Sequence, residues 1–197
     1  MRTRHRALPL AMVVGLLSTM LGLPTISLAS ELARDPGTAS ALDGAKLRPD
    51  DRATLLRYAR DTWASFVAMT DPATGLPSDS LATDGTPSVQ TSTTNIGAYL
   101  WSTLVAEELQ IIGHAEAVVR IGRTLHSLET MERHEPSGQY YNWYDHTTGA
   151  KLTAWPPSGD PMTPILSSVD NGWLAAGLQV VSNSVPEVAA RASALFD

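Results

Sequence analysis

The apolar residues in the last three quarters of the chain recur at helical spacing in four long segments. From about 51 to 69, this spacing predicts an amphipathic helix with charged residues on its other faces. Segments 95 to 112 and 170 to 182 are apolar on most of their helical faces, which predicts helices that are buried on most sides. From about 115 to 133, one apolar stripe predicts a half-exposed helix, and Pro186 suits the first turn of a fifth, half-polar helix.

These segments follow one order twice, which indicates a structural repeat. Each copy contains an amphipathic outer helix, a long loop, a buried inner helix and a tight link. The turns Asp71-Pro-Ala-Thr-Gly75 and Asp145-His-Thr-Thr-Gly149 lie 74 residues apart, and in each the Asp can bond the backbone while the Gly takes a positive φ. Because successive helices alternate in direction, both long loops and both inner-helix N-termini are expected at the same end.

The second long loop, from 138 to the start of the inner helix expected at 170, is unusually aromatic. Five of the twelve aromatic residues fall in it: Tyr140, Tyr141, Trp143, Tyr144 and Trp155. Long loops in compact domains are usually functional or disordered, and disordered segments contain few aromatic residues. The loop therefore indicates a binding surface, while the alternative is that its rings cap the core.

The first residues have the pattern of an export leader. Three arginines precede an uncharged apolar run, and Ser27-Leu-Ala29 ends in the small-x-small pattern of a signal-peptidase site. The alternative is a membrane anchor, but this run is short and interrupted for a bilayer span. We expect a signal peptide over 1–29, a linker over 30–48 and one domain over 49–197, secreted or retained in the periplasm or cell envelope, with no stable membrane span once the leader is removed.

Charge and composition exclude several kinds of partner. The net charge is −6, and it becomes −9 without the leader, because three arginines and no acidic residue leave with it. A basic stripe is the usual footprint of nucleic-acid binding, and the chain lacks one. The sequence contains no cysteine, and its histidines lack the spacing of a metal site, so neither a metal nor another cofactor is expected.

Polar residues gather at the predicted starts of both inner helices. Capping explains some of them, since Ser, Thr, Asn and Asp are common at helix starts. Their number beside tryptophans also describes a pocket that bonds sugar hydroxyls and stacks on sugar rings. Asp170 is the best-placed carboxylate, because the dipole of a buried helix favours its ionised form; alternatively, it is a structural cap. The residues that gather here are Thr91, Ser92, Thr94, Asn95, Ser167, Ser168, Asp170 and Asn171, beside Trp143, Trp155 and Trp173.

Four ordered motifs in 48–197 resemble the glucoamylase-like six-hairpin glycosidases, a group that includes bacterial beta-1,2-glucanases and a domain of cyclic beta-1,2-glucan synthases. The motifs are Thr74-Gly-Leu-Pro-Ser-Asp79, Thr91-Ser-x-Thr-Asn-Ile-Gly97, Tyr141-Asn-Trp-Tyr-Asp145 and Ser167-Ser-Val-Asp-Asn-Gly-Trp-Leu-Ala-Ala-Gly177. The resemblance implies an all-α fold, an (α/α)6 barrel whose inner-helix N-termini line a substrate funnel. It implies that Asp170 is catalytic and that the funnel is lined by Asp79, Thr94, Asn95, Trp143, Tyr144, Asp145, Asn171 and Trp173.

Length is the departure from this family. The chain supplies two hairpins and the start of a third, and it lacks the later motif that contributes a candidate catalytic glutamate in the family. The expectation is therefore a secreted glycoside hydrolase for a beta-linked glucan such as beta-1,2-glucan, present as an N-terminal part that is inactive alone. The alternative is a non-catalytic carbohydrate-binding or interaction protein on the same scaffold.

Overall fold

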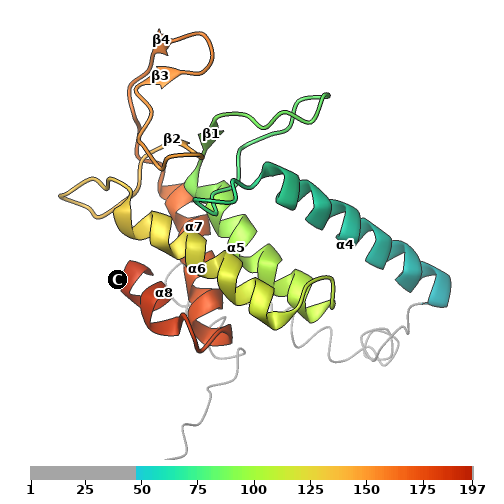
Figure 1. The fold of residues 1–197 in the computed structure, drawn as a ribbon. Coiled ribbons are helices and arrows are strands. Elements are labelled where there is room, and N and C mark those ends of the chain that lie inside the picture. The colour runs from blue at the N-terminus through green and yellow to red at the C-terminus, as the bar shows by residue number, and fades with distance from the viewer. Residues whose placement is uncertain (1–47, 197) are drawn as a thin grey trace, which may run out of the picture. The chain divides into compact units, whose positions relative to one another are not determined.

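The computed structural model describes residues 48–196, so the expected leader over 1–29 and the linker, apart from Arg48, lie outside the described residues. The described part is mostly helical (Figure 1). Its helices are α4 (Pro49–Met69), α5 (Thr93–Glu108), α6 (His114–Thr130), α7 (Ser168–Ser184) and α8 (Ala189–Phe196). Its strands have two residues each: β1 (Gln90–Thr91), β2 (Tyr144–Asp145), β3 (Ala154–Trp155) and β4 (Asp160–Pro161).

Helix α4 is amphipathic and contacts the other helices through its second half. Trp63 is its buried residue, and the Trp63 ring stacks on Tyr99 of α5 with centroids 6.1 Å apart. Phe66 packs on the same tyrosine at 6.0 Å. The first half of α4 extends away from the other helices in Figure 1, and Leu55 there is 51% exposed. Leu55 and Tyr58 are therefore left exposed by the part of the chain that the structure describes, while Leu56 and Ala59 are partly buried.

Helices α5 and α7 are the inner helices, and they lie side by side in the same direction. Their N-terminal ends meet where Thr94 donates a hydrogen bond to Asp170. Beyond their C-terminal ends, His114 lies 2.9 Å from Glu187. His114 is the first residue of α6, after the tight link from α5, and Glu187 lies just after α7. The adjacent, parallel arrangement that the repeat predicted is therefore confirmed.

Two glycines allow these inner helices to approach closely. A β-carbon added to Gly177 would lie 2.8 Å from the carbonyl oxygen of Gly97, and one added to Gly97 would collide with the backbone of Trp173. No side chain larger than hydrogen fits between the backbones at these points. The glycines therefore set the spacing between α5 and α7.

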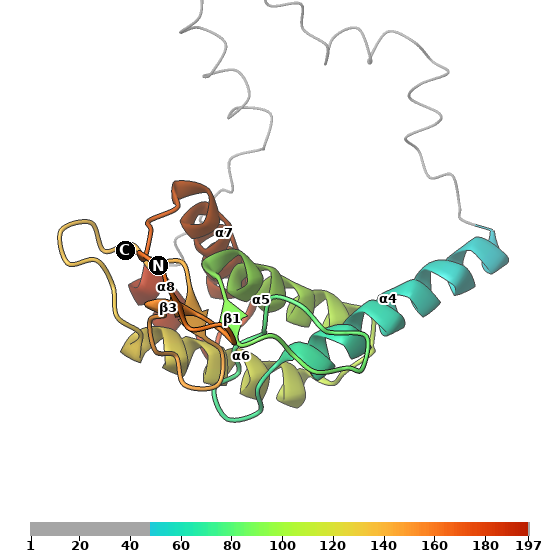
Figure 2. The same cartoon turned by 90° about the horizontal axis from the view of Figure 1, so that it is seen from above.

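The two long loops lie at the same end of the helices, as the repeat predicted. Strand β1, at the end of the first loop, pairs antiparallel with β2 in the second. Thr74 also donates its hydroxyl to the carbonyl oxygen of His146 at 2.6 Å. Figure 2 shows β1 beside the N-terminal end of α5. The loops are thus joined across the repeat.

The aromatic loop also forms a small hairpin that helical periodicity could not predict. Strands β3 and β4 pair antiparallel, with Trp155 opposite Asp160. In Figure 1 this hairpin projects away from the helices.

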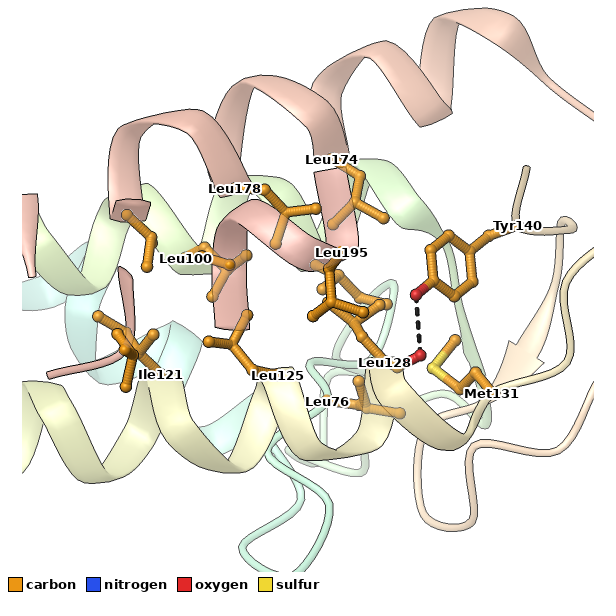
Figure 3. Close-up of a cluster of buried hydrophobic side chains, with 14 of the residues drawn as sticks. Leu76, Leu100, Ile121, Leu125, Leu128, Met131, Tyr140, Leu174, Leu178 and Leu195 are labelled. Carbon is orange, nitrogen blue, oxygen red and sulfur yellow. Dashed lines mark hydrogen bonds between the residues drawn. The ribbon is translucent and has the colours of Figure 1, made fainter. Parts of the chain in front are cut away.

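The main core fills the space between α5, α6, α7 and α8. Figure 3 shows Leu125 and Leu128 of α6 on the opposite side of this core from Leu174 and Leu178 of α7. Ile121, Leu125 and Leu128 are fully buried, which confirms the apolar stripe predicted for α6. Such a layer stabilises the fold through the apolar area it removes from water.

Helix α7 buries one face in this core and leaves another exposed. Val169, Trp173 and Val180 are 69%, 45% and 40% exposed, and Gly172 and Ala176 beside them are also exposed. These positions recur every three or four residues and so form one stripe. We call Val169, Gly172, Trp173, Ala176 and Val180 the free face of α7. Within 48–196, no helix is long and apolar enough to cross a membrane.

Candidate functional site

The candidate site is built on the N-terminal ends of α5 and α7, and its first layer is helix capping. Ser92 caps α5 in a capping box, in which the Asn95 side-chain oxygen accepts from the Ser92 amide at 2.9 Å. Ser167 caps α7, where its hydroxyl oxygen accepts from the Asp170 amide at 3.2 Å. Capping thus engages Asn95, which the sequence placed in the funnel. It also shows that Asp170 is not the cap of α7.

The Asp170 carboxylate joins three separate parts of the chain. One oxygen accepts from the Thr94 hydroxyl of α5. The other oxygen accepts from the Asn142 side-chain amide of the aromatic loop at 2.9 Å. We call Thr94, Asn142 and Asp170 the carboxylate cluster. Its three members are 28 to 76 residues apart in the sequence.

The surroundings of Asp170 favour its charged form. Burial raises the pKa of its carboxyl, but hydrogen bonds with Ser167, Thr94 and Asn142 outweigh burial, and the pKa falls below its ordinary value of 3.8. The N-terminal dipole of α7 acts in the same direction. Asp170 is therefore ionised at neutral pH, which suits a base or a charge-stabilising group and not a proton donor.

Asn171 and Tyr144, which the sequence assigned to the funnel, hold the aromatic loop in place. The Asn171 side-chain oxygen accepts from the Tyr140 amide, and its nitrogen donates to the Tyr140 carbonyl, both at 2.9 Å. Tyr144 is fully buried, and its hydroxyl donates to the Glu132 carbonyl at 2.6 Å. Burial raises the pKa of Tyr144 strongly and that of Tyr140 to about 12. The rings of Tyr140 and Tyr144 therefore belong to the core, in line with the alternative that the aromatic rings of this loop cover the core. Tyr144 does not face the surface of the candidate site.

Asp145 and Asp79 also lie outside the carboxylate cluster. One Asp145 oxygen accepts from the amide and the hydroxyl of Thr147, both at 2.7 Å, so the carboxylate stabilises its own turn. Asp79 is exposed, and its amide donates to the Gln90 carbonyl at 2.8 Å.

Tryptophan side chains lie on both sides of the helix starts. Trp143 is half-buried and contacts Trp155 of β3, with ring centroids 6.2 Å apart. Trp173 meets Trp101 of α5 edge-on at 5.2 Å. Trp155 and Trp173 are 40% and 45% exposed. Exposed indole faces of this kind can stack on sugar rings.

A hollow of about 310 Å³ opens beside Thr94, between the end of α4 and the start of α5. It is lined by Thr62, Ser65, Phe66, Met69, Pro77, Ser78, Thr94, Asn95 and Ala98. The predicted residues Thr94 and Asn95 thus border a concave surface. Among residues 48–196, no three His, Cys, Asp or Glu side chains lie close enough together to hold a metal ion.

Asn142 and Trp101 belong to the site but were not predicted from the sequence. Asn142 stands in a quoted motif, but its partner Asp170 is 28 residues away, and no local pattern indicates that contact. Trp101 lies seven residues after Thr94 and so shares a helix face with it. This spacing could have indicated that Trp101 lies on the same side of the helix as the site.

The chain is similar to known proteins in both sequence and structure. The curated cyclic beta-(1,2)-glucan synthase NdvB of Rhizobium meliloti is 35% identical over 144 residues, which are 71% of this chain and 5% of the synthase. An endo-beta-1,2-glucanase of Chitinophaga pinensis, solved with sophorotriose and glucose, superposes with a TM-score of 0.58 at 19% identity. A candidate glucoamylase of Bacteroides caccae has the same TM-score at 21% identity.

The chain covers only part of these relatives. Both structural matches include 73% of this chain, which corresponds to 36% of the Bacteroides caccae chain and 35% of the Chitinophaga pinensis chain. At these identities the structural likeness establishes the fold, which is that of helical hairpins from an (α/α)6 barrel. A family model described as "Protein of unknown function (DUF3131)" matches residues 57–197. The chain therefore belongs to the DUF3131 family, and its hairpins form part of a glucoamylase-like six-hairpin glycosidase-related domain.

Proposed function

We propose that this domain binds a beta-1,2-linked glucan over the N-terminal ends of α5 and α7, as part of a secreted glycoside hydrolase. The observation that carries the proposal is the carboxylate cluster, which holds the ionised Asp170 between the two inner helices. Trp173, three residues after Asp170 on α7, and Trp155, in the projecting β3–β4 hairpin, add exposed rings that can stack on a sugar. The glucanase of Chitinophaga pinensis, which has the same fold, was solved with sophorotriose, and the related synthase is named for a beta-1,2-glucan.

The chemistry of Asp170 assigns it one half of a hydrolytic pair. Glycoside hydrolysis usually needs one protonated and one ionised carboxyl group. Asp170 fits the ionised role, since its pKa is lowered. The proton donor would then come from outside the carboxylate cluster. Export of the chain, with a mature N-terminus at Ser30, remains part of this proposal and is tested by sequencing the secreted protein.

A non-catalytic carbohydrate-binding protein is the second candidate. The observation in its favour is that the carboxylate cluster contains one carboxylate, Asp170. Stacking rings and hydrogen-bonding groups are sufficient for binding, whereas hydrolysis needs the second carboxyl group.

Titration of the 197-residue chain with sophorotriose, followed by tryptophan fluorescence, tests the shared part of both candidates. We expect saturable binding, and Asp170→Asn should raise the Kd about 5- to 200-fold, the equivalent of one polar contact of about 1 to 3 kcal/mol. Asn183→Ala, at the far end of α7, is the matched control and should bind normally. A folded chain that shows no saturable response to millimolar sophorotriose would refute the proposal.

Hydrolysis separates the two candidates. Because one carboxylate is not enough, the 197-residue chain should release reducing sugar from beta-1,2-glucan only at the background rate. In a longer chain that does hydrolyse the glucan, Asp170→Asn should lower turnover about a hundredfold or more if Asp170 is a catalytic base. Normal turnover in that variant would instead support a binding role for Asp170.

A further inference from the structure

The backbone of Asn142 is fixed independently of its side chain. Its amide donates to the Ile165 carbonyl at 2.9 Å, and the Ile165 amide donates back to the Asn142 carbonyl at 3.2 Å. This pairing joins the start of the aromatic loop to the segment just before α7. The Asn142 side chain therefore leaves from an anchored point, and it is 96% buried.

One of the two polar atoms in the Asn142 side chain has a hydrogen-bond partner, and the other has none. Its nitrogen donates to Asp170 at 2.9 Å, while its oxygen is buried without a hydrogen-bond partner. Turning the amide over would place that oxygen against a carboxylate oxygen, and the two acceptors would repel each other. The observed orientation is thus imposed by the charge on Asp170.

A side chain that only filled this space would be apolar. Leucine has nearly the same shape as asparagine and would leave no unpaired acceptor, which is costly in a buried position. Local violations of this kind are expected where function requires them. The unpaired oxygen of Asn142 therefore indicates that the role of this side chain is to donate a hydrogen bond to Asp170.

We propose that Asn142 is a positioning residue that, together with Thr94, fixes the orientation of the Asp170 carboxylate and stabilises its charged form. This inference rests on the proposed function of Asp170. Thr94 and Asn142 come from different elements and hold different carboxylate oxygens, and Ser167 adds a local hydrogen bond, so the carboxylate plane cannot rotate freely. Each oxygen can accept two hydrogen bonds, so capacity remains for a sugar hydroxyl or a water molecule.

The test is a ¹³C NMR titration of the Asp170 carboxyl group in the 197-residue chain. Asn142→Leu keeps the volume and removes the donor, so it should raise the Asp170 pKa without lowering the Tm. Asn142→Asp places a like charge against Asp170 and should raise the pKa further. Thr94→Val removes the other donor and should also raise it. Asn183→Ala changes the same residue type at the far end of α7 and should leave the Asp170 pKa unchanged.

Sophorotriose binding by the same variants separates this inference from the proposed function. Loss of the donor in Asn142→Leu should also weaken binding about tenfold. An unchanged Asp170 pKa in a folded Asn142→Leu or Thr94→Val variant would overturn the positioning role, even where the wild-type chain binds the sugar. A raised pKa in a chain that never binds sophorotriose would overturn the proposed function and leave the electrostatic coupling intact.

Discussion

Asp71 and Asp145 occupy equivalent turns in the two copies of the repeat. The Asp71 side chain accepts hydrogen bonds from the amides two and three residues later. The Asp145 side chain accepts one from the amide of Thr147, two residues later. Gly75 and Gly149 close the turns with φ of 69° and 72°, as the sequence predicted. The sequence alone could have moved Asp145 from the funnel to a turn, because its equivalent Asp71 lies in the same motif.

The asparagines show what residue types cannot predict. Asn95, Asn142 and Asn171 all lie near the inner-helix starts, yet they serve a capping box, a carboxylate and a loop anchor respectively. An amide offers the same donors and acceptors in each role. Only the distant partners separate them, and these are fixed by the packing of the hairpins.

Our first stability prediction concerns the glycine contact between the inner helices. Gly177→Ala should lower the free energy of unfolding by about 1 to 3 kcal/mol, because its β-carbon would lie 2.8 Å from Gly97. Gly172→Ala on the same helix has open space around its β-carbon and should raise stability by up to about 1 kcal/mol. Urea denaturation measures both. Equal stability of the two variants would contradict the close-packing argument.

Apolar periodicity predicted the type and order of α4, α5, α6 and α7. Pro186 indicated a fifth helix but lies in the turn before α8, which begins at Ala189. Ends were less accurate, and the causes are visible. Helix α5 was expected to continue to 112 but ends at Glu108, because Gln110 adopts a left-handed φ of 57°. Helix α6 was expected to reach 133 but ends at Thr130, since Arg133 pairs with Tyr140 in an extended bridge. The strands escaped prediction because two residues are too short to show alternation.

An ion cluster joins three elements at the end opposite the site. His114 begins α6, and its two ring nitrogens lie 2.7 Å from Glu107 of α5 and 2.9 Å from Glu187 beyond α7. Hydrogen bonds with Glu187 and Glu107 raise the pKa of His114 above 6.5. The hydrogen bond with His114 lowers the pKa of Glu187 below 4.5. His114 and Glu187 are therefore both charged between pH 4.5 and pH 6.5.

This cluster predicts a pH dependence of stability. The His114 contribution is complete below pH 6.5 and is lost as the pH rises through the raised pKa of the folded state. The Glu187 contribution is complete above pH 4.5 and is lost as the pH falls through its lowered pKa. The Tm should therefore decrease as pH rises above 6.5, and His114→Gln should weaken this decrease.

His134→Gln is the control, since the ring of His134 contacts Ser137 and not a carboxylate. Thermal melts between pH 5 and 9 give the comparison. Identical pH profiles for wild type and His114→Gln would show that the exposed cluster contributes nothing, as many surface ion pairs do.

The free face of α7 is the main apolar surface that the described residues leave uncovered. In a complete barrel, an inner helix has neighbours on both sides, and α7 has α5 on one side only within the described residues. The two structural relatives are longer, and this chain matches 36% and 35% of their lengths. A helix that is apolar on most faces requires more than one neighbour to cover it.

The isolated chain should therefore bind a hydrophobic dye and self-associate. Val169→Glu combined with Val180→Lys should reduce both, and each new charge suits its end of the helix dipole, so the Tm should not fall. Val119→Lys on α6, also at a half-exposed valine, is the control and should change dye binding little. A monodisperse wild-type chain without dye binding would contradict this prediction, which light scattering and dye fluorescence can check.

The bond between Thr74 and His146, together with the pairing of β1 with β2, has a consequence for how the chain folds. Each long loop is completed by residues of the other copy, so neither hairpin can finish its own loop before the second has been synthesised and docked. Loop closure over 72 residues brings an entropic cost that local helix formation does not compensate until both copies are in place. The loops that carry the site should thus share the cooperative unit of the helices, and we expect the site to become ordered together with them.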